Sequence, residues 1–183
     1  MRKCSVNEMT IRRPAKTDQE ELNELFIAVI KHTFKKEGLS HMTEEMEEEI
    51  EQKKQFLETD LVSNGIAHYF LIAVDADKNK IIGTIACGPA NELILSGTNG
   101  VLKDCLEIGT VFVHPAYQKQ GVGSALLSHL IRDMREKGII RYCLDSGYKQ
   151  AQNVWRNKLG EPSYFMEDYW GEGNHHMIWT KTI

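Results

Sequence analysis

Two glycines at the start of a predicted helix mark the stretch of sequence with the clearest chemical use. Gly121 and Gly123 follow an apolar, strand-like run, and Val122 begins a series of apolar residues at helical spacing. A helix N-terminus exposes unpaired N–H groups and carries about half a positive charge, so it stabilises an anion that can come close. Because the glycines lack Cβ atoms and residues 118–120 add amides and one cation, the stretch predicts a site for a diphosphate.

The spacing of these glycines limits which ligand is expected. A dinucleotide fingerprint, Gly-x-Gly-x-x-Gly, would need glycine at the position of Leu126, and the Gly-Lys-Ser/Thr ending of a P-loop is missing. A doubly wound nucleotide-binding protein is therefore the weakest candidate. A structural alternative is that the glycines ease a tight strand-to-helix connection and bind nothing.

The cysteines and histidines do not form a pattern of metal ligands. Cys4, Cys87, Cys105 and Cys143 are scattered and include no Cys-x-x-Cys pair, which is typical of idle thiols in a reducing compartment. The adjacent histidines at 175–176 would point to opposite faces of a strand. We therefore expect no metal ion.

The elements that position the glycine turn can be predicted from the periodicity of apolar residues. The spacing of Thr17-Asp18-Gln19-Glu20 is that of a capping box and predicts the start of a first helix, which ends near Gly38. A second amphipathic helix carries a run of glutamates, which either face solvent or line an entrance for a cationic substrate; the solvated face is the simpler interpretation. These glutamates are Glu44, Glu45, Glu47, Glu48, Glu49 and Glu51.

The remaining elements predict an α+β domain with a mixed sheet. The strand between residues 105 and 113 and the strand between 139 and 145 should be parallel, because a helix joins them through a right-handed crossover. In order, we expect strands at 10–14, 67–74 and 81–87, an unassigned excursion at 88–104, a strand at 105–113, a helix at 122–138, a strand at 139–145, a helix at 150–159, and strands at 164–169 and 176–181.

Length, charge and hydropathy exclude several classes of protein. At 183 residues the chain is expected to form one domain, residues 1–183. A formal net charge of −4 provides no basic field for nucleic acid. No stretch approaches the roughly 18–20 apolar residues that cross a bilayer. We therefore expect a cytoplasmic protein that binds neither nucleic acid nor membrane.

The glycine turn resembles a known family motif. The residues Gln118-Lys119-Gln120-Gly121-Val122-Gly123 are similar to the Q/R-x-x-G-x-G/A motif of the GNAT superfamily of N-acetyltransferases. The surrounding residues 107–127 resemble that family's fourth strand and following helix, and the order of elements resembles its fold from Thr10 to the C-terminus. The resemblance implies a GNAT-like mixed, mostly antiparallel central sheet with one parallel, splayed pair of strands, flanked by helices.

The resemblance also implies a co-substrate and the residues that bind it. Acetyl-CoA would be the acetyl donor, with no metal. Its diphosphate would lie against the backbone amides of Gln118, Lys119, Gln120, Gly121, Val122, Gly123 and Ser124. The pantetheine arm would pair with the main chain of the fourth strand, at Val111, Phe112 and Val113, and the N–H of Val111 would stabilise the oxyanion.

A candidate base follows from the same resemblance. Glu107 lies where several family members carry a catalytic glutamate, and it would remove a proton from the attacking amine, often through a water molecule. Strict alternation along the strand would place Glu107 on the same face as Val111 and Val113. The alternative is a solvated strand end or an ion-pair partner.

The sequence departs from the family pattern in the last predicted helix. Arg156 lies where many members have a tyrosine that protonates the departing thiolate, and Lys149 lies where they have asparagine. Arginine keeps its proton, so Arg156 could bind a phosphate but is a poor acid. Tyr148 and Tyr164 are possible substitutes. Four aromatic residues could line an acceptor pocket or belong to the core: Trp155, Tyr169, Trp170 and Trp179.

These features together predict an acetyl-CoA-dependent N-acetyltransferase acting on a primary amine of a small molecule or a peptide. The alternative is a module of the same fold that binds acyl-CoA and has weak catalysis or none. Exposed edges of the C-terminal strands could also pair two copies into a homodimer.

Overall fold

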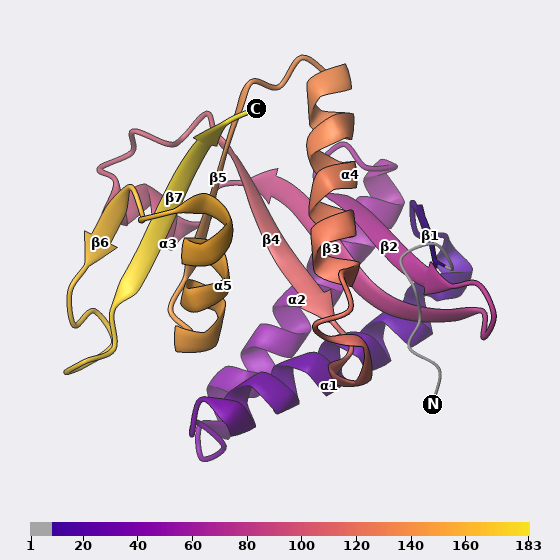
Figure 1. Ribbon diagram of the computed structural model, residues 1–183, viewed down its shortest axis with the longest axis horizontal. Helices are drawn as coiled ribbons and strands as arrows, with labels where there is room; N and C mark the ends of the chain where they lie inside the picture. The colour runs from indigo at the N-terminus through magenta and orange to yellow at the C-terminus, as the bar shows by residue number, and fades with distance from the viewer. Residues whose placement is uncertain (1–8) are drawn as a thin grey trace. The chain divides into compact units, whose positions relative to one another are not determined.

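The strand-like segments of the sequence assemble into one seven-stranded sheet (Figure 1), in a computed structural model that describes residues 9–183. The strand order is β1-β2-β3-β4-β5-β7-β6. Most pairs are antiparallel, and β4 and β5 are the parallel pair. The predicted α+β class with a mixed, mostly antiparallel sheet is therefore confirmed.

The strands are β1 (Met9–Arg12), β2 (Tyr69–Asp75), β3 (Lys80–Pro89), β4 (Leu106–Val113), β5 (Arg141–Ser146), β6 (Tyr164–Met166) and β7 (His176–Thr182). The helices are α1 (Gln19–Lys36), α2 (Thr43–Ser63), α3 (Glu92–Gly97), α4 (Val122–Glu136) and α5 (Lys149–Leu159). Two 3-10 turns, η2 (Lys16–Asp18) and η3 (Pro115–Tyr117), precede α1 and α4. No helix among these is long and apolar enough to cross a membrane.

Contacts within the chain divide it into two compact units. Unit 1 holds the described residues up to Cys87 together with Thr110–Asp133, and unit 2 holds Gly88–Gly109 together with Met134–Ile183. Each unit is therefore built from two separate segments of sequence. Strand β4 and helix α4 each contribute residues to both units.

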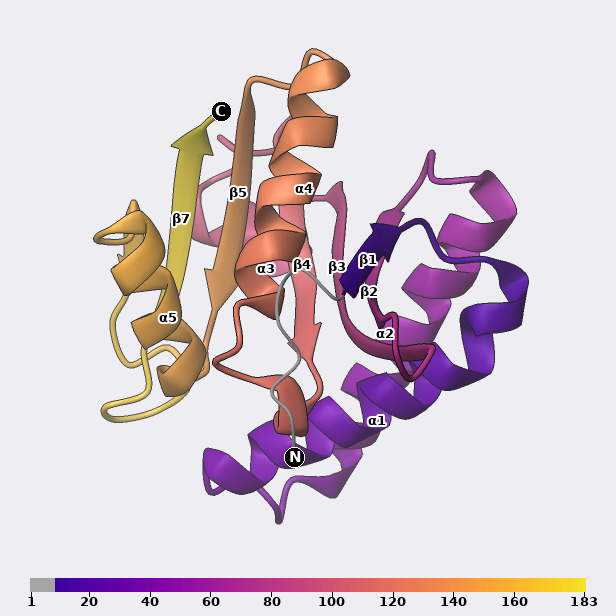
Figure 2. The same ribbon diagram turned by 45° about the vertical axis from the view of Figure 1, so that its right-hand side comes forward.

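Unit 1 contains the helices predicted from apolar spacing. The buried stripe of α1 includes Phe26, whose ring centroid lies 6.3 Å from that of Phe70 and 6.0 Å from that of Phe112. Helix α1 packs along α2 (Figure 1). The first turns of α4 lie against β3 (Figure 2), where a Cβ atom on Gly83 would come within 3.1 Å of Val122 Cγ1. This close approach fixes the start of α4 against the sheet.

The start of α1 differs from the predicted capping box. Thr17 lies inside η2, and α1 begins at Gln19. The carboxylate of Asp18 accepts a hydrogen bond from the N–H of Ala15 at 2.7 Å and binds the guanidinium of Arg12 at 2.6 and 2.9 Å. The prediction of a capping box at Thr17 is therefore wrong, because Asp18 closes the 3-10 turn η2 before α1.

Exposed carboxylates cover one side of α2. Five of the six predicted glutamates are exposed, and four of them line a hollow on the surface of this helix, while Ile50 and Leu57 are buried. The four are Glu44, Glu47, Glu48 and Glu51. A solvated helix face accounts for this arrangement.

Unit 2 is organised around the antiparallel pair β5 and β7. Its core joins Ile94, Leu102, Cys105, Cys143 and Ile178. The excursion at 88–104 contains α3, which the sequence does not predict, and Ile94 within it is buried. Helix α3 begins there because an asparagine side chain just before it accepts a hydrogen bond from the N–H of Ile94 at 2.9 Å.

The sixth strand is shorter than the predicted 164–169. It ends at Met166, and the following residues form a turn in which Asp168, Gly171 and Gly173 have φ of 49°, 107° and 72°. The ladder with β7 ends at Met166 and the chain turns there, so the aromatic residues at 169–170 belong to a loop.

Three thiols are buried and form no disulfide among the described residues. They are Cys87, Cys105 and Cys143, and burial raises the pKa of Cys143. Cys4 lies outside the described residues. Within residues 9–183, no group of three or more histidine, cysteine, aspartate or glutamate side chains could hold a metal ion.

Candidate active site

The predicted anion-binding turn lies in unit 1, between the end of β4 at Val113 and the start of α4 at Val122. Lys119 and Gly121 have φ of 61° and 87°, in the left-handed region. These two residues turn the chain from η3 into the helix. Glycine accepts this conformation without strain, whereas Lys119 adopts it at a cost, and such residues cluster at functional sites.

The turn is held in shape by its own side chains. The side-chain amide of Gln118 donates to the carbonyl of Val113 at 3.2 Å, and that of Gln120 donates to the carbonyl of Ala116 at 2.9 Å. The N–H of Ala125 makes the first helical bond, to Gly121 at 3.0 Å. The first N–H groups of a helix have no partner one turn earlier inside the helix, so this end of α4 is the kind of position at which proteins bind anions.

Gly123 is not required by the fold. A Cβ atom added there would meet only Val113 Cγ2, at 3.5 Å, which is an ordinary van der Waals contact. The positive φ of Gly121 explains why glycine is needed at that position in the free protein, but no comparable requirement exists at Gly123. The structural alternative of an eased connection therefore explains Gly121 but does not explain Gly123.

A buried tyrosine anchors η3 to the turn between β2 and β3. The hydroxyl of Tyr117 donates to Asp75 Oδ2 at 3.2 Å and accepts from Lys78 Nζ at 2.8 Å. Burial raises the pKa of Asp75, but hydrogen bonds from Lys78 and Tyr117 outweigh it and lower the pKa overall. No local sequence pattern predicts this anchor, because Tyr117 and Asp75 lie about 40 positions apart.

Strand β4 contains a backbone irregularity that the sequence did not reveal. Thr110 has a φ of 49° and is buried. A β-branched residue in the left-handed region is a genuine outlier, with a cost of about 1–3 kcal/mol. Strict alternation, which would place Glu107 on one face with Val111 and Val113, requires every intervening residue to be extended, and Thr110 departs from that conformation.

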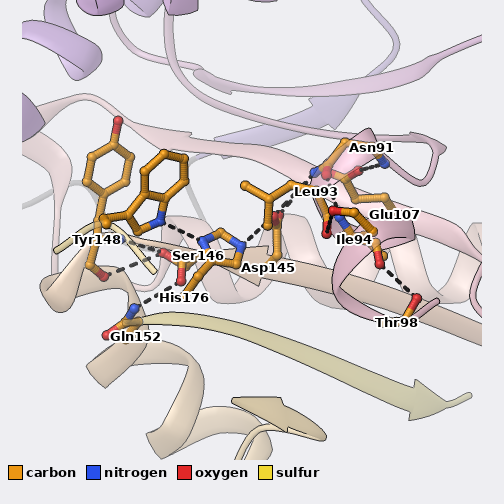
Figure 3. Close-up of polar contacts among 12 residues, drawn as sticks. Asn91, Leu93, Ile94, Thr98, Glu107, Asp145, Ser146, Tyr148, Gln152 and His176 are labelled. Carbon is orange, nitrogen blue, oxygen red and sulfur yellow. Dashed lines mark hydrogen bonds and ion pairs between the residues drawn. The ribbon is translucent and has the colours of Figure 1, made fainter. Parts of the chain in front are cut away.

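Glu107 lies in the part of β4 that belongs to unit 2, where it is half-buried. Its Oε2 accepts a hydrogen bond from the N–H of Asn91 at 2.8 Å (Figure 3). Its Oε1 lies beside Gly109, where a Cβ atom would approach it at 3.2 Å. The carboxylate is thus held at the start of α3.

Further polar residues of unit 2 are linked to Glu107 through Asn91, and no local sequence pattern connects them with it. Asn91 Nδ2 lies 3.3 Å from both carboxylate oxygens of Asp145, and His176 Nε2 lies 2.8 Å from Asp145 Oδ2 (Figure 3). The indole N–H of Trp170 donates to His176 Nδ1 at 3.1 Å. The available signal was an aspartate and a histidine within otherwise largely apolar strand segments.

A comparison with protein families decides the affiliation of the chain. The model of the acetyltransferase (GNAT) family matches residues 30–160, which include β4, the glycine turn and α5. The chain belongs to the GNAT family. The resemblance of the motif at 118–123 to GNAT proteins is thereby confirmed.

Solved GNAT structures share the fold. A GNAT-family protein from Desulfovibrio desulfuricans has a TM-score of 0.70 at 14% identity, covering 95% of this chain and 98% of that one. The PaiA N-acetyltransferase of Thermoplasma acidophilum, solved in complex with coenzyme A, has a TM-score of 0.67 at 18% identity, with 96% and 99% covered. YncA of Salmonella typhimurium, solved with its cofactor acetyl-CoA, has 0.65 at 17% identity, with 95% and 93% covered. A search of curated proteins found no match.

The helix that departs from the GNAT pattern is α5. Arg156 Nε lies 3.3 Å from a carboxylate oxygen of Glu161, in a geometry that makes no hydrogen bond, and it has no other hydrogen-bond partner among the described residues. Binding of a phosphate by Arg156 stays a prediction. Tyr148 precedes α5, with its N–H bonded to Ser146 Oγ at 3.2 Å. Tyr164 pairs with Ile178 in the sheet.

The four aromatic residues considered for an acceptor pocket fall into two classes. Trp155 and Trp179 are buried, with exposed fractions of 8% and 0%, and belong to the core of unit 2. Tyr169 and Trp170 are exposed, at 45% and 56%, with ring centroids 4.9 Å apart. Only the second pair is accessible to a ligand.

Proposed function

We propose that this GNAT chain transfers the acetyl group of acetyl-CoA to a primary amine of a small molecule or a peptide, by direct attack of the nitrogen on the thioester. One observation carries the proposal: Gly123 leaves space at a helix N-terminus that the fold itself does not need. Family membership supplies the reaction class, and the relatives solved with coenzyme A or acetyl-CoA support the choice of co-substrate.

The cofactor contacts follow from the same turn. The amides from Gln118 to Ser124 would bind the diphosphate, as an anion at a helix N-terminus. The main chain of residues 111–113 would pair with the pantetheine arm in the manner of an added strand. Strand β4 pairs with β5 at Leu106 and Glu107, before this stretch.

The chemistry requires a base, an oxyanion donor and a leaving group. Glu107 would take the proton of the amine directly or through water, with its carboxylate oriented by the N–H of Asn91. The backbone N–H of Val111, beside the strained Thr110, would stabilise the tetrahedral oxyanion. The carbon–sulfur bond then breaks, and the thiolate, with a reference thiol pKa of about 8.5, leaves and takes up a proton. The products are the N-acetyl amine and coenzyme A.

A second candidate is a coenzyme A-binding module without catalysis. It is favoured by Arg156 and Lys149, which occupy positions where relatives place helper groups. Release of free thiol from acetyl-CoA across a panel of amines distinguishes the two candidates. The enzyme gives amine-stimulated thiol, and the module gives none although calorimetry detects the cofactor.

Replacement of the candidate base tests the mechanism. Glu107→Gln keeps an oxygen that can accept from Asn91 but removes the basic site. We expect kcat to fall by about 100-fold, the size of a general-base contribution, with little change in the affinity for acetyl-CoA. Unchanged kcat at saturating amine across neutral pH would remove Glu107 from the mechanism. Absence of any acetyl-CoA binding by the folded wild type at millimolar concentration would remove the proposed function altogether.

A further inference from the structure

A continuous chain of hydrogen bonds inside unit 2 leads from an exposed loop to the candidate base (Figure 3). Trp170 donates to His176, His176 contacts Asp145, Asp145 contacts Asn91, and Asn91 donates to Glu107, at 3.1, 2.8, 3.3 and 2.8 Å in that order. These residues come from five separate places in the sequence. Such a chain is costly to assemble unless each buried polar group is satisfied by the next.

The direction of every bond in the chain is determined. An indole N–H can only donate, so His176 Nδ1 must accept and carries no proton. The proton of the neutral ring is then on Nε2, which donates to Asp145. A carboxylate can only accept, so Asn91 presents its NH2 group to Asp145 and its Oδ1 to the N–H of Ile94 at 2.9 Å. The orientation of Asn91 is therefore set from both ends.

This geometry excludes His176 as an acid or base in the reaction. Both ring nitrogens are engaged, one with Trp170 and the other with Asp145, and the side chain is only 4% exposed. Asp145 is likewise engaged with two partners. The contacts therefore allow His176 and Asp145 to act on the reaction only through Asn91.

The loop that carries Trp170 is built to hold the indole in place. The backbone N–H of Trp170 donates to the carbonyl of Asn174 at 2.9 Å, and the carboxylate of Asp168 accepts from the backbone N–H of Gly173 at 2.7 Å. The Trp170 residue is 56% exposed, yet its indole N–H donates to the buried side chain of His176. The indole N–H of Trp170 therefore fixes the tautomer of His176, although the exposed ring does not belong to the core.

We propose that Asp145, His176 and Trp170 are positioning residues that hold Asn91 and, through its N–H, the carboxylate of Glu107 in the orientation needed to deprotonate the amine. The inference rests on the proposed function, in which Glu107 is the base. It extends the machinery of the reaction to an outer loop, about 63 positions from Glu107 in sequence.

Nuclear magnetic resonance tests the coupling without reference to activity. The probes are the nitrogen chemical shifts of the His176 ring and the proton chemical shift of the backbone amide of Asn91, which is called the Asn91 amide below. In Trp170→Phe, which keeps an aromatic ring but removes the donor, the His176 ring should no longer hold the single Nε2–H form. In His176→Leu the Asn91 amide should shift. Thr180→Leu, which puts the same residue elsewhere in β7, should leave that amide unchanged. A folded His176→Leu protein with an unmoved Asn91 amide would overturn the proposal.

Kinetics test the consequence. His176→Leu should lower kcat for amine acetylation by about tenfold or more, the usual size of a supporting-residue effect, while the KM for acetyl-CoA stays unchanged. His176→Gln, which can still donate toward Asp145, should recover part of the loss. If His176→Leu does not fold, Trp170→Phe carries both measurements, because its ring is largely exposed. Unchanged kcat in a variant whose Asn91 amide has shifted would also overturn the proposal.

The two hypotheses fail in different ways. If the wild-type protein releases no thiol with any amine, but the backbone amide resonance of Asn91 shifts in His176→Leu, the proposed function is wrong and the positioning of Glu107 stands. If the wild-type protein is active, but that resonance does not shift in the variant, the proposed function stands and the positioning proposal is wrong.

Discussion

Gly121 and Gly123 stand two residues apart in one turn and answer different requirements. The φ of 87° at Gly121 is needed for the chain to enter α4, whether or not a ligand is bound. Gly123 has space for a side chain in the free protein. Substitution at Gly123 therefore separates binding from folding, whereas substitution at Gly121 changes both.

We expect Gly123→Val to weaken acetyl-CoA binding by more than about tenfold, equivalent to about 1.4 kcal/mol, because the new side chain occupies the approach to the amides. Its melting temperature should stay close to that of Ser128→Val, which adds the same side chain at an exposed position of α4. Calorimetric titration with acetyl-CoA measures the effect. Equal affinities in the two variants would mean that no ligand occupies the space beside Gly123.

The position of the connection from β4 through η3 to α4 depends on contacts with residues from another part of the chain. Tyr117 fastens η3 to Asp75 and Lys78 in the turn between β2 and β3. The sequence predicts the strand, the turn and the helix because each has its own period or its own glycine. It does not predict the anchor, the short helix α3 or the irregularity at Thr110, because these are determined by packing partners distant in the sequence.

Tyr117→Phe should cost about 1–3 kcal/mol in the free energy of unfolding, since it leaves the buried Asp75 with one donor fewer. It should also weaken acetyl-CoA binding, because η3 leads directly into the anion turn. Urea unfolding and calorimetry provide the two measurements. Tyr142→Phe is the matched control, since Tyr142 is buried but its hydroxyl makes no hydrogen bond among the described residues. Equal stability of both variants would argue against the anchor.

The residues of the candidate active site also differ in whether neighbouring or distant parts of the sequence bring them together. The turn residues from Gln118 to Ser124 are contiguous, so a motif can identify them. The partners of Glu107 come from α3, β5 and β7, and only the folded chain brings Asn91, Asp145 and His176 together. Likewise, residue types alone did not reveal that Asp18, and not Thr17, closes the turn before α1.

For the whole molecule, the division into two units raises the question of whether they unfold together. All three tryptophans lie in unit 2, at positions 155, 170 and 179. Intrinsic fluorescence therefore reports on unit 2, whereas far-ultraviolet circular dichroism reports on both units. We propose that residues 1–183 form one cooperative domain, which predicts coincident unfolding curves from the two probes in urea. Separated midpoints would contradict it.

Stability at high pH gives a second prediction for the whole molecule. Burial, and then a hydrogen bond of 2.8 Å to Asp133, raise the pKa of Tyr69 from 10.0 to about 12. The fold thus favours the neutral phenol, so this contribution is complete below pH 10 and is lost as the pH rises to about 12. The free energy of unfolding should decline over that interval in wild type and decline less in Tyr69→Phe. Parallel declines would exclude Tyr69 as the source.

The interleaving of the two units has a consequence for biosynthesis. Ile94, Leu102 and Cys105 leave the ribosome well before Cys143 and Ile178, their partners in the core of unit 2. Meanwhile unit 1 cannot close until residue 133 has emerged. From the emergence of residues 88–109 until the last strand, β7, is synthesised, the nascent chain therefore presents an unfilled apolar surface, and a chaperone that binds exposed apolar segments should stay bound over that interval.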